Sequence, residues 1–537
     1  MSVISRRVGK RSRRPLIWQS ARNDSAAFAT VAETPAATPL RRDVSGRGVN
    51  AGAQKPSIRP GVTHPLADAA QNAKLHQYEC SVKARFDLLR DAARQFVEQH
   101  DIERMRTDAL NDAYFRIAQV NLSDRAWDGL KCAPQSLRAQ LLYVESTFAE
   151  YIRTANDFYI NDPLHGRSEA RAFRQRLLDL GIHGIDMAPC ADGRLAHVVS
   201  YVLRLPWSVV RRKAHAGAMF DVSESVRNWV FTEYTRFAFN QPNPVNADSR
   251  YLTIAVYHYS KTDPGHLGCA AHGSDEHKAA QAALQKLQDY RTAIENRFGC
   301  GAAVRTLLLG LNTDDDTLRV HVPDETGQLD LDRYVDTGAL YAATQGMSAE
   351  AAAERIEIEI DSACIRDRAV PPAPEVRALL AMLIRNNFSQ IAYVQDYEGG
   401  QYTDLDHAER FIGIGDVLED VQLRNLCYYS YMHTIEEGAD DIDVGIKIFK
   451  KLNVKQGLPI PVIIRCTYDG RVPESRDRAI ARANRLENAL IARYKPLVDG
   501  LMLFTLKTLR DHTQCHPPEV VGAEQEHLAC YFRSAKE

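Results

Sequence analysis

Residues 184–194 read GIDMAPCADGR, an apolar segment that runs directly into a short polar loop. A second apolar segment, residues 251–260 (YLTIAVYHYS), is rich in β-branched and aromatic residues. An amphipathic helix follows, which we expect Ser274 to cap and Gly299 to end. Apolar strands that alternate with such helices are typical of an α/β sheet, whose binding sites lie at the carboxyl ends of the strands. We therefore predict an α/β domain over residues 163–410, with CADGR at the edge where ligands bind.

A similar pattern recurs near the carboxyl terminus. Residues 458–466 (LPIPVIIRC) run into TYDGR, and residues 500–509 (GLMLFTLKTL) form another strand-like segment. We interpret residues 411–537 as a degenerate second copy of the α/β unit, produced by internal duplication. In this interpretation Cys466 matches Cys190 of the first copy.

The predicted second copy carries an altered site. An extra residue separates Cys466 from Asp469, compared with the spacing in CADGR. Lys507, which cannot bind a metal as histidine does, stands in our matching at the position of His258. We therefore expect the second copy to be non-catalytic.

Two further segments precede the α/β units. Residues 61–162 have apolar residues at helical spacing, which predicts an α-helical N-terminal domain. Residues 1–60 contain 12 Lys and Arg against 3 Asp and Glu, a net charge of +9, and too few apolar residues for a core. This composition predicts a disordered basic tail. The fold class is thus α+β multidomain: tail, helical domain, α/β domain and degenerate repeat.

The overall composition excludes several classes of protein. With 45% hydrophobic and 25% charged residues, the chain has globular rather than fibrous or disordered composition. No apolar run reaches the roughly 18 residues of a membrane span, so we expect no membrane partner. The 10 cysteines have no paired spacing, which favours a reducing compartment over a disulfide framework.

Five side chains of the first copy have the chemistry of a metal site. Cys190, His258 and Cys269 offer two thiolates and one imidazole, which with an open fourth position is typical of catalytic zinc. Asp192 could orient a water molecule on the metal, and Arg194 could hold that carboxylate through two hydrogen bonds.

The pattern C-x-D-x-R followed by His and Cys resembles the β-type carbonic anhydrases. The full arrangement of basic tail, helical domain, CADGR, YHYS, GCAAHGSD and altered second copy resembles the carboxysome shell carbonic anhydrase family over essentially the whole chain. The resemblance implies one Zn2+ per chain, held by Cys190, His258 and Cys269. It also implies that Asp192 and Arg194 form the catalytic dyad.

The identity of the histidine ligand has an alternative. Ordinary β-type enzymes have the spacing H-x2-C, which His266 and Cys269 match literally. The carboxysomal family places its histidine farther from the second cysteine, which implies His258. We retain His266 as the second candidate.

The resemblance also implies a function and partners. The expected reaction is the reversible, zinc-dependent hydration of CO2 to bicarbonate, which would supply CO2 to Rubisco inside the carboxysome. The expected partners are Rubisco or shell proteins, reached through the basic tail, and further copies of this chain in a homodimer or larger oligomer, but not nucleic acid. The alternative function is a non-catalytic scaffold whose zinc is structural and whose fourth coordination position is filled by protein.

Overall fold

The computed structural model describes residues 57–160, 167–239, 249–299, 304–514 and 516–521. The predicted basic tail therefore lies outside the described residues, except for residues 57–60. These last residues are anchored, because the backbone N–H of Arg59 donates to Oε1 of Gln345 at 2.8 Å. All described residues belong to one compact unit that begins at Lys55.

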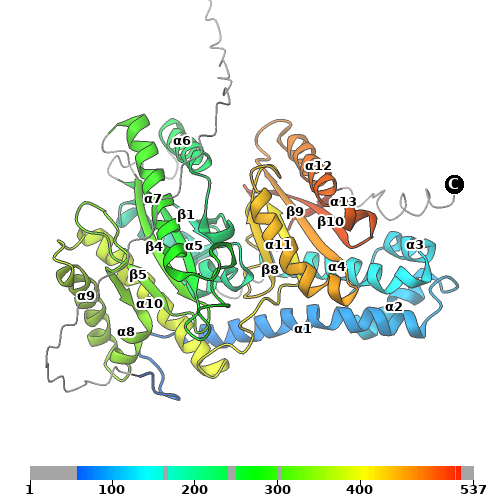
Figure 1. Cartoon of the computed structure of the whole chain (residues 1–537), viewed down its shortest axis with the longest axis horizontal. Helices are drawn as coiled ribbons and strands as arrows, with labels where there is room; N and C mark the ends of the chain where they lie inside the picture. Colours follow the sequence, from blue (N-terminus) through cyan, green and yellow to red (C-terminus); the bar gives the residue numbers. More distant parts are fainter. Residues whose placement is uncertain (1–56, 161–166, 240–248, 300–303, 515, 522–537) are drawn as a thin grey trace, which may run out of the picture. The chain divides into compact units, whose positions relative to one another are not determined.

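The N-terminal region is helical, as its periodicity predicts (Figure 1). Phe86, Leu89 and Ala93 are buried on one face of the first helix. This face does not form a separate core, because it joins a hydrophobic cluster that includes Phe411 and Ile463 of the carboxyl-terminal sheet. The helices are α1 (Ala69–Gln99), α2 (Thr107–Ala118), α3 (Asp124–Cys132) and α4 (Arg138–Ile160).

A six-stranded sheet follows, with the order β2-β1-β3-β4-β5-β6. The first four strands in this order are parallel, and β5 and β6 are antiparallel to their neighbours. The strands are β1 (Ile182–Pro189), β2 (Val210–Arg212), β3 (Arg250–Tyr259), β4 (Val304–Asn312), β5 (Leu318–His321) and β6 (Tyr334–Asp336). The helices of this part are α5 (Arg167–Asp179), α6 (Val222–Phe239), α7 (Glu276–Phe298), α8 (Thr337–Thr344), α9 (Ala349–Arg366) and α10 (Pro374–Tyr397).

The ends of helix α7 test a local prediction. Gly299 ends the helix with a φ of 90°, as predicted. The predicted N-cap, Ser274, is wrong by one residue, since Asp275 accepts the hydrogen bond from the Lys278 backbone. Ser274 instead lies in the left-handed region with a φ of 63°, and its N–H closes a turn onto the carbonyl of Cys269 at 2.9 Å. Ser274 therefore belongs to the turn that begins at Cys269, and the next residue, Asp275, caps the helix.

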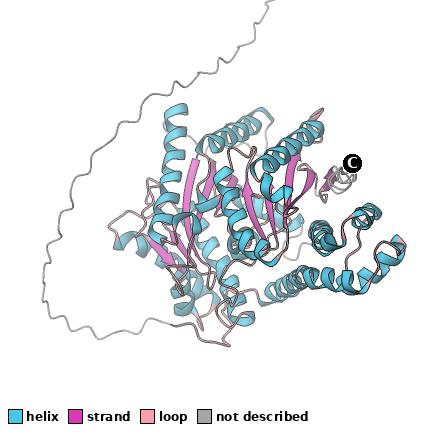
Figure 2. Cartoon of the chain, turned by 45° about the vertical axis from the view of Figure 1, so that its right-hand side comes forward, coloured by secondary structure: helices cyan, strands magenta, loops and turns pink. Residues whose placement is uncertain are grey.

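The carboxyl-terminal part contains a second sheet, and the strands of both sheets are magenta in Figure 2. The strand order of this second sheet is β11-β10-β9-β7-β8. Strands β8, β7, β9 and β10 are parallel, and β11 is antiparallel to β10. Order and directions repeat those of β2-β1-β3-β4-β5, which confirms the predicted second α/β unit. Its elements are β7 (Phe411–Gly415), β8 (Cys427–Tyr431), α11 (Ala439–Leu452), β9 (Ile460–Tyr468), α12 (Ser475–Arg493), α13 (Lys495–Asp499), β10 (Leu503–Asp511) and β11 (Glu519–Val521).

The same topology corrects our residue matching between the copies. Cys466 lies on β9, which has the place of β3, so it matches the strand of His258 rather than Cys190. Lys507 lies on β10, which has the place of β4. The matching was wrong by one strand because an apolar run followed by an Asp-Gly turn is a pattern that several strands share.

The described part of the second unit has no metal-ligand cluster. The two groups of three possible ligands found among the described residues both include side chains of the CADGR loop. Cys466 contacts Arg482 Nε at 3.4 Å rather than a histidine or a second thiol. That the second copy is non-catalytic stays a prediction.

No helix in the described ranges combines the length and the apolar character that a membrane span requires.

Candidate metal centre

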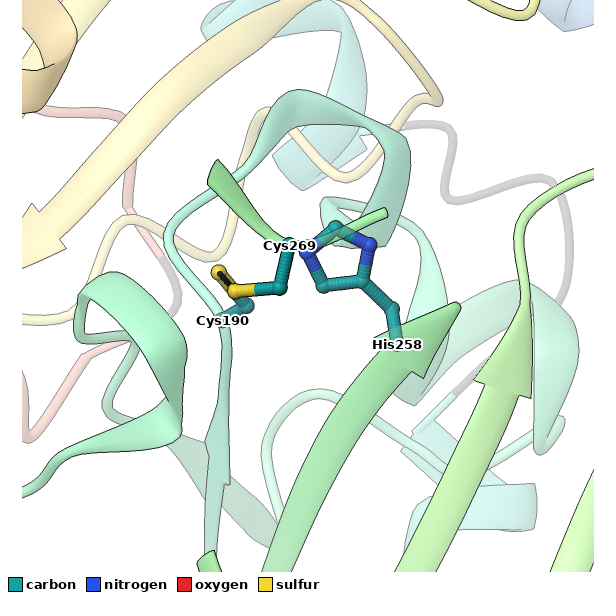
Figure 3. Close-up of side chains that lie close together, drawn as sticks. All are labelled: Cys190, His258 and Cys269. Atoms are coloured by element: carbon teal, nitrogen blue, oxygen red, sulfur yellow. Dashed lines mark hydrogen bonds between the residues drawn. The ribbon is translucent and has the colours of Figure 1, made fainter. Parts of the chain in front are cut away.

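Three side chains that are far apart in the sequence converge beside the first sheet (Figure 3). Cys190 directly follows β1, His258 is the next-to-last residue of β3, and Cys269 lies in the loop between β3 and α7. The two sulfur atoms are 3.9 Å apart, and possible ligand atoms of all three residues lie within 4.8 Å of one another. All three side chains are buried.

The sheet register explains why Cys190 and His258 meet. Strands β1 and β3 are adjacent and parallel, with Pro189 opposite Val256. The chain beyond both strands therefore emerges at the same edge, and the N–H of Cys190 donates to the Val256 carbonyl at 3.2 Å. Cys269 lies farther along the loop after β3, at the start of a turn that the Ser274 N–H closes.

The donor set fits a thiophilic cation such as Zn2+. His258 is fully buried, yet neither of its ring nitrogens has a hydrogen-bond partner, a costly state that a metal ion would relieve. The contact with the Cys269 sulfur, together with burial, raises the pKa of Cys190 well above its usual value. The same contact lowers the pKa of Cys269, and a bound cation would favour the thiolate form of both sulfurs.

The structure does not bring His266 to this cluster. Its side chain is 85% exposed, and its Nδ1 is hydrogen-bonded to Asp263 at 2.9 Å. His272, also near Cys269, bonds instead to the Gly217 carbonyl at 3.2 Å.

Asp192 and Arg194 form a buried, bidentate ion pair at the edge of the cluster. Arg194 Nε donates to Oδ1 of Asp192 at 3.0 Å, and its terminal nitrogen donates to Oδ2 at 2.6 Å. Burial alone would raise the pKa of Asp192, but the adjacent Arg194 guanidinium holds that pKa well below its usual range. Oδ2 lies 3.8 Å from Nε2 of His258, so the carboxylate faces the candidate metal ligands.

Arg194 also fastens the dyad to two other chain segments. Its third guanidinium nitrogen donates to the carbonyl of Leu267 at 2.6 Å and to that of Leu405 at 3.2 Å. Leu267 is two residues before Cys269. The same guanidinium thus orients Asp192 and holds the loop that carries the second thiol.

Two residues near the dyad were missed by sequence reasoning. His407 and Glu409 form a second ligand-type group with Asp192, and Oε1 of Glu409 accepts from the Gly193 N–H at 3.1 Å. A Cβ on Gly193 would lie 2.5 Å from Cγ of Glu409, so this close approach requires glycine. Burial lowers the pKa of His407, but Asp192 and Glu409 outweigh it and raise that pKa to about 9. The charged stretch around His407 carried no signal that separates it from an ordinary surface loop.

The second α/β unit also contributes backbone contacts to the dyad loop. The N–H of Tyr429 donates to the Ala191 carbonyl at 3.1 Å, and that of Asn425 donates to the Gly193 carbonyl at 2.9 Å. The predicted non-catalytic copy therefore forms one wall of the candidate site.

The buried Cys-His-Cys group and the Asp-Arg pair, set in a doubled α/β fold, have the composition of a metalloenzyme site. Comparison with known proteins shows the family to which the chain belongs. The family model described as the catalytic domain of carboxysome shell carbonic anhydrase matches residues 172–407, and the carboxyl-terminal model of the same family matches residues 408–525. The chain belongs to the carboxysome shell carbonic anhydrase family and is a carbonic anhydrase.

Three similar proteins carry the name of the same family. The carboxysome shell carbonic anhydrase of Hydrogenovibrio crunogenus is 52% identical over 89% of this chain and 90% of its own length. That of Parasynechococcus marenigrum is 46% identical over 86% of this chain and 79% of its own length. That of Halothiobacillus neapolitanus is 39% identical over 82% of this chain and 86% of its own length. Family membership associates the chain with the carboxysome, as the sequence predicted.

Proposed function

We propose that this chain binds one Zn2+ through Cys190, His258 and Cys269 and uses it for the reversible hydration of CO2 to bicarbonate. The observation that carries the proposal is the buried His258 ring, which faces two thiols and has no hydrogen-bond partner. The chemistry that zinc supplies at such a site is to lower the pKa of a water molecule, so that hydroxide is available near neutral pH to attack CO2.

In this proposal Asp192 would orient the attacking hydroxide. Its low pKa keeps the carboxylate ionised at neutral pH, so that it can accept a hydrogen bond but cannot donate one. By accepting a hydrogen bond from the hydroxide, the carboxylate would leave a lone pair of the hydroxide oxygen directed toward CO2. Arg194 holds both carboxylate oxygens and prevents Asp192 from turning to become a metal ligand itself.

The alternative function is a scaffold with structural zinc, and the fourth coordination position separates the two. Crystals of the zinc-loaded protein, measured at the zinc absorption edge, should show one anomalous peak between Cys190, His258 and Cys269, with water as the fourth ligand. Occupation of the fourth position by Asp192 or another protein side chain would favour the scaffold.

We propose further that the basic tail recruits Rubisco, to which the enzyme would supply CO2, and that the protein acts as a homodimer or larger oligomer. The net charge of +9 on residues 1–60 supports attraction to an acidic partner. Such attraction should weaken with added salt, because the screening length falls to about 10 Å at 0.1 M.

Removal of the tail tests this partner. A chain of residues 57–537, which keeps only the anchored last four residues of the tail, should lose salt-sensitive binding to Rubisco and retain CO2 hydration, because the candidate metal centre lies outside the removed segment. Undiminished binding by the shortened chain, or stronger binding of the full chain to DNA at physiological salt, would contradict the proposed partner.

A further inference from the structure

The turn between strands β4 and β5 contains three consecutive aspartates. Residues 313–317 read TDDDT, and we call them the acidic turn. The hydrogen bonds of Asp315 stay within the turn and the strand residue that precedes it, because its Oδ1 accepts from Asn312 at 2.6 Å and from the Thr317 hydroxyl at 2.6 Å. Asp314 and Asp316 instead bond to segments outside the turn. We propose that these two aspartates are positioning residues: Asp314 holds the loop that carries Cys269, and Asp316 holds the segments around the Asp192–Arg194 pair. This inference rests on the zinc site proposed above.

Asp314 holds the chain that leads to Cys269. Its buried Oδ2 accepts from the backbone N–H groups of Lys261 and Thr262 at 2.7 and 2.8 Å. These residues begin two positions after the end of β3 and are three and four positions beyond His258. The N–H of Thr313 adds a bond to the carbonyl of Tyr259 at 2.9 Å. Asp314 therefore fixes the start of the loop whose end supplies the second thiol.

Asp316 holds two segments that meet at Arg194. Its Oδ2 accepts three hydrogen bonds, from His197 Nε2 at 2.7 Å, Gln390 Nε2 at 2.9 Å and the Tyr402 hydroxyl at 2.7 Å. His197 lies three residues after Arg194. Tyr402 lies three residues before Leu405, whose carbonyl accepts from the Arg194 guanidinium. A single carboxylate thus fixes the dyad segment and the segment against which the dyad arginine rests.

The conformation of Asp316 is consistent with a specific role. The residue is fully buried and has a φ of 57°, in the left-handed region that non-glycine residues adopt at a cost. A buried carboxylate is also costly unless it is hydrogen-bonded, and here His197, Gln390 and Tyr402 donate to it. The surrounding contacts therefore hold a strained, charged residue in the one place where it reaches three separate segments.

Substitution of Asp316 should lower kcat, whereas substitution of Asp314 should speed the release of zinc. Asp316→Asn keeps the shape of the side chain but removes the charge that His197 faces, so the dyad should shift while both thiols and His258 stay in place. We expect kcat to fall about 10- to 100-fold, the range that a misplacement of roughly 1 Å produces, with one zinc per chain retained and KM nearly unchanged. Asp314→Ala should instead speed the release of zinc to a chelator about tenfold, and kcat per zinc-loaded chain should stay within about twofold of wild type.

Asp315 provides the matched controls, since its bonds lie within the same turn. Asp315→Asn and Asp315→Ala should leave both kcat and the zinc release rate near the wild-type values, even if the melting temperature falls. If Asp316→Asn does not fold, Tyr402→Phe removes one of the three donors and should lower kcat about threefold at full zinc content. Equal effects of the Asp315 and Asp316 substitutions, or an unchanged kcat in Asp316→Asn, would overturn the inference. Wild-type protein without zinc or hydration activity in the same assays would instead refute the proposed metal site.

Discussion

His258→Ala should remove zinc and CO2 hydration together. The substitution deletes the only imidazole in the buried ligand group, and two thiolates 3.9 Å apart would then lack a third protein ligand. Because metal affinity depends on the complete ligand set, we expect metal content near zero and a hydration rate that does not exceed the uncatalysed rate in the same buffer. Metal analysis of the purified variant, with hydration measured in parallel, checks this result. Cys190→Ser should have the same two effects.

The control for this prediction is His266→Ala, because His266 is the other histidine that the sequence allowed. Its exposed side chain bonds only Asp263 among the contacts described, so its loss should change neither zinc content nor rate. Full zinc occupancy in His258→Ala, combined with loss of zinc in His266→Ala, would show that the ligand is the other histidine.

Asp192→Asn should separate metal binding from catalysis. The amide has the size of the carboxylate and leaves Cys190, His258 and Cys269 untouched, so zinc should remain at one ion per chain. The amide can present an N–H where the carboxylate offered an acceptor, so the attacking hydroxide loses its orienting group. We expect kcat to fall by about 10²-fold or more, the size of a positioned acid–base contribution.

The measurement is kcat per zinc-loaded chain, determined by stopped flow together with metal analysis. Asp469→Asn is the matched control, because Asp469 forms the same bidentate pair with Arg471 in the second unit, at the protein surface. That variant should keep the wild-type rate. An Asp192→Asn enzyme with an unchanged rate would exclude the proposed orienting role.

Local patterns in the sequence predicted the parts of the site that lie beside strand ends. Cys190, Asp192 and Arg194 form one five-residue loop, so their proximity follows from the sequence alone. The choice of His258 over His266 came from the resemblance, and the structure gives it a physical basis in the adjacency of β1 and β3. Nothing local in the sequence indicates that adjacency, since it depends on which strands pair.

The features that sequence reasoning missed depend on contacts between distant segments. The close approach of Gly193 and Glu409 joins residues 216 positions apart, and such a contact leaves no periodic pattern. The matching of Cys466 to Cys190 was wrong for the same reason, because strand order and not motif similarity decides which strands correspond. Helical periodicity correctly predicted which face of α1 is buried but not that the second sheet shares its core.

Removal and restoration of zinc test the central claim most directly. Purified full-length protein should contain one zinc per chain and catalyse CO2 hydration. A chelator should abolish both, and added Zn2+ should restore the rate in proportion to the metal bound, reaching its maximum at one ion per chain. Hydration that persists after complete removal of zinc, or zinc that binds without restoring any hydration, would contradict the account.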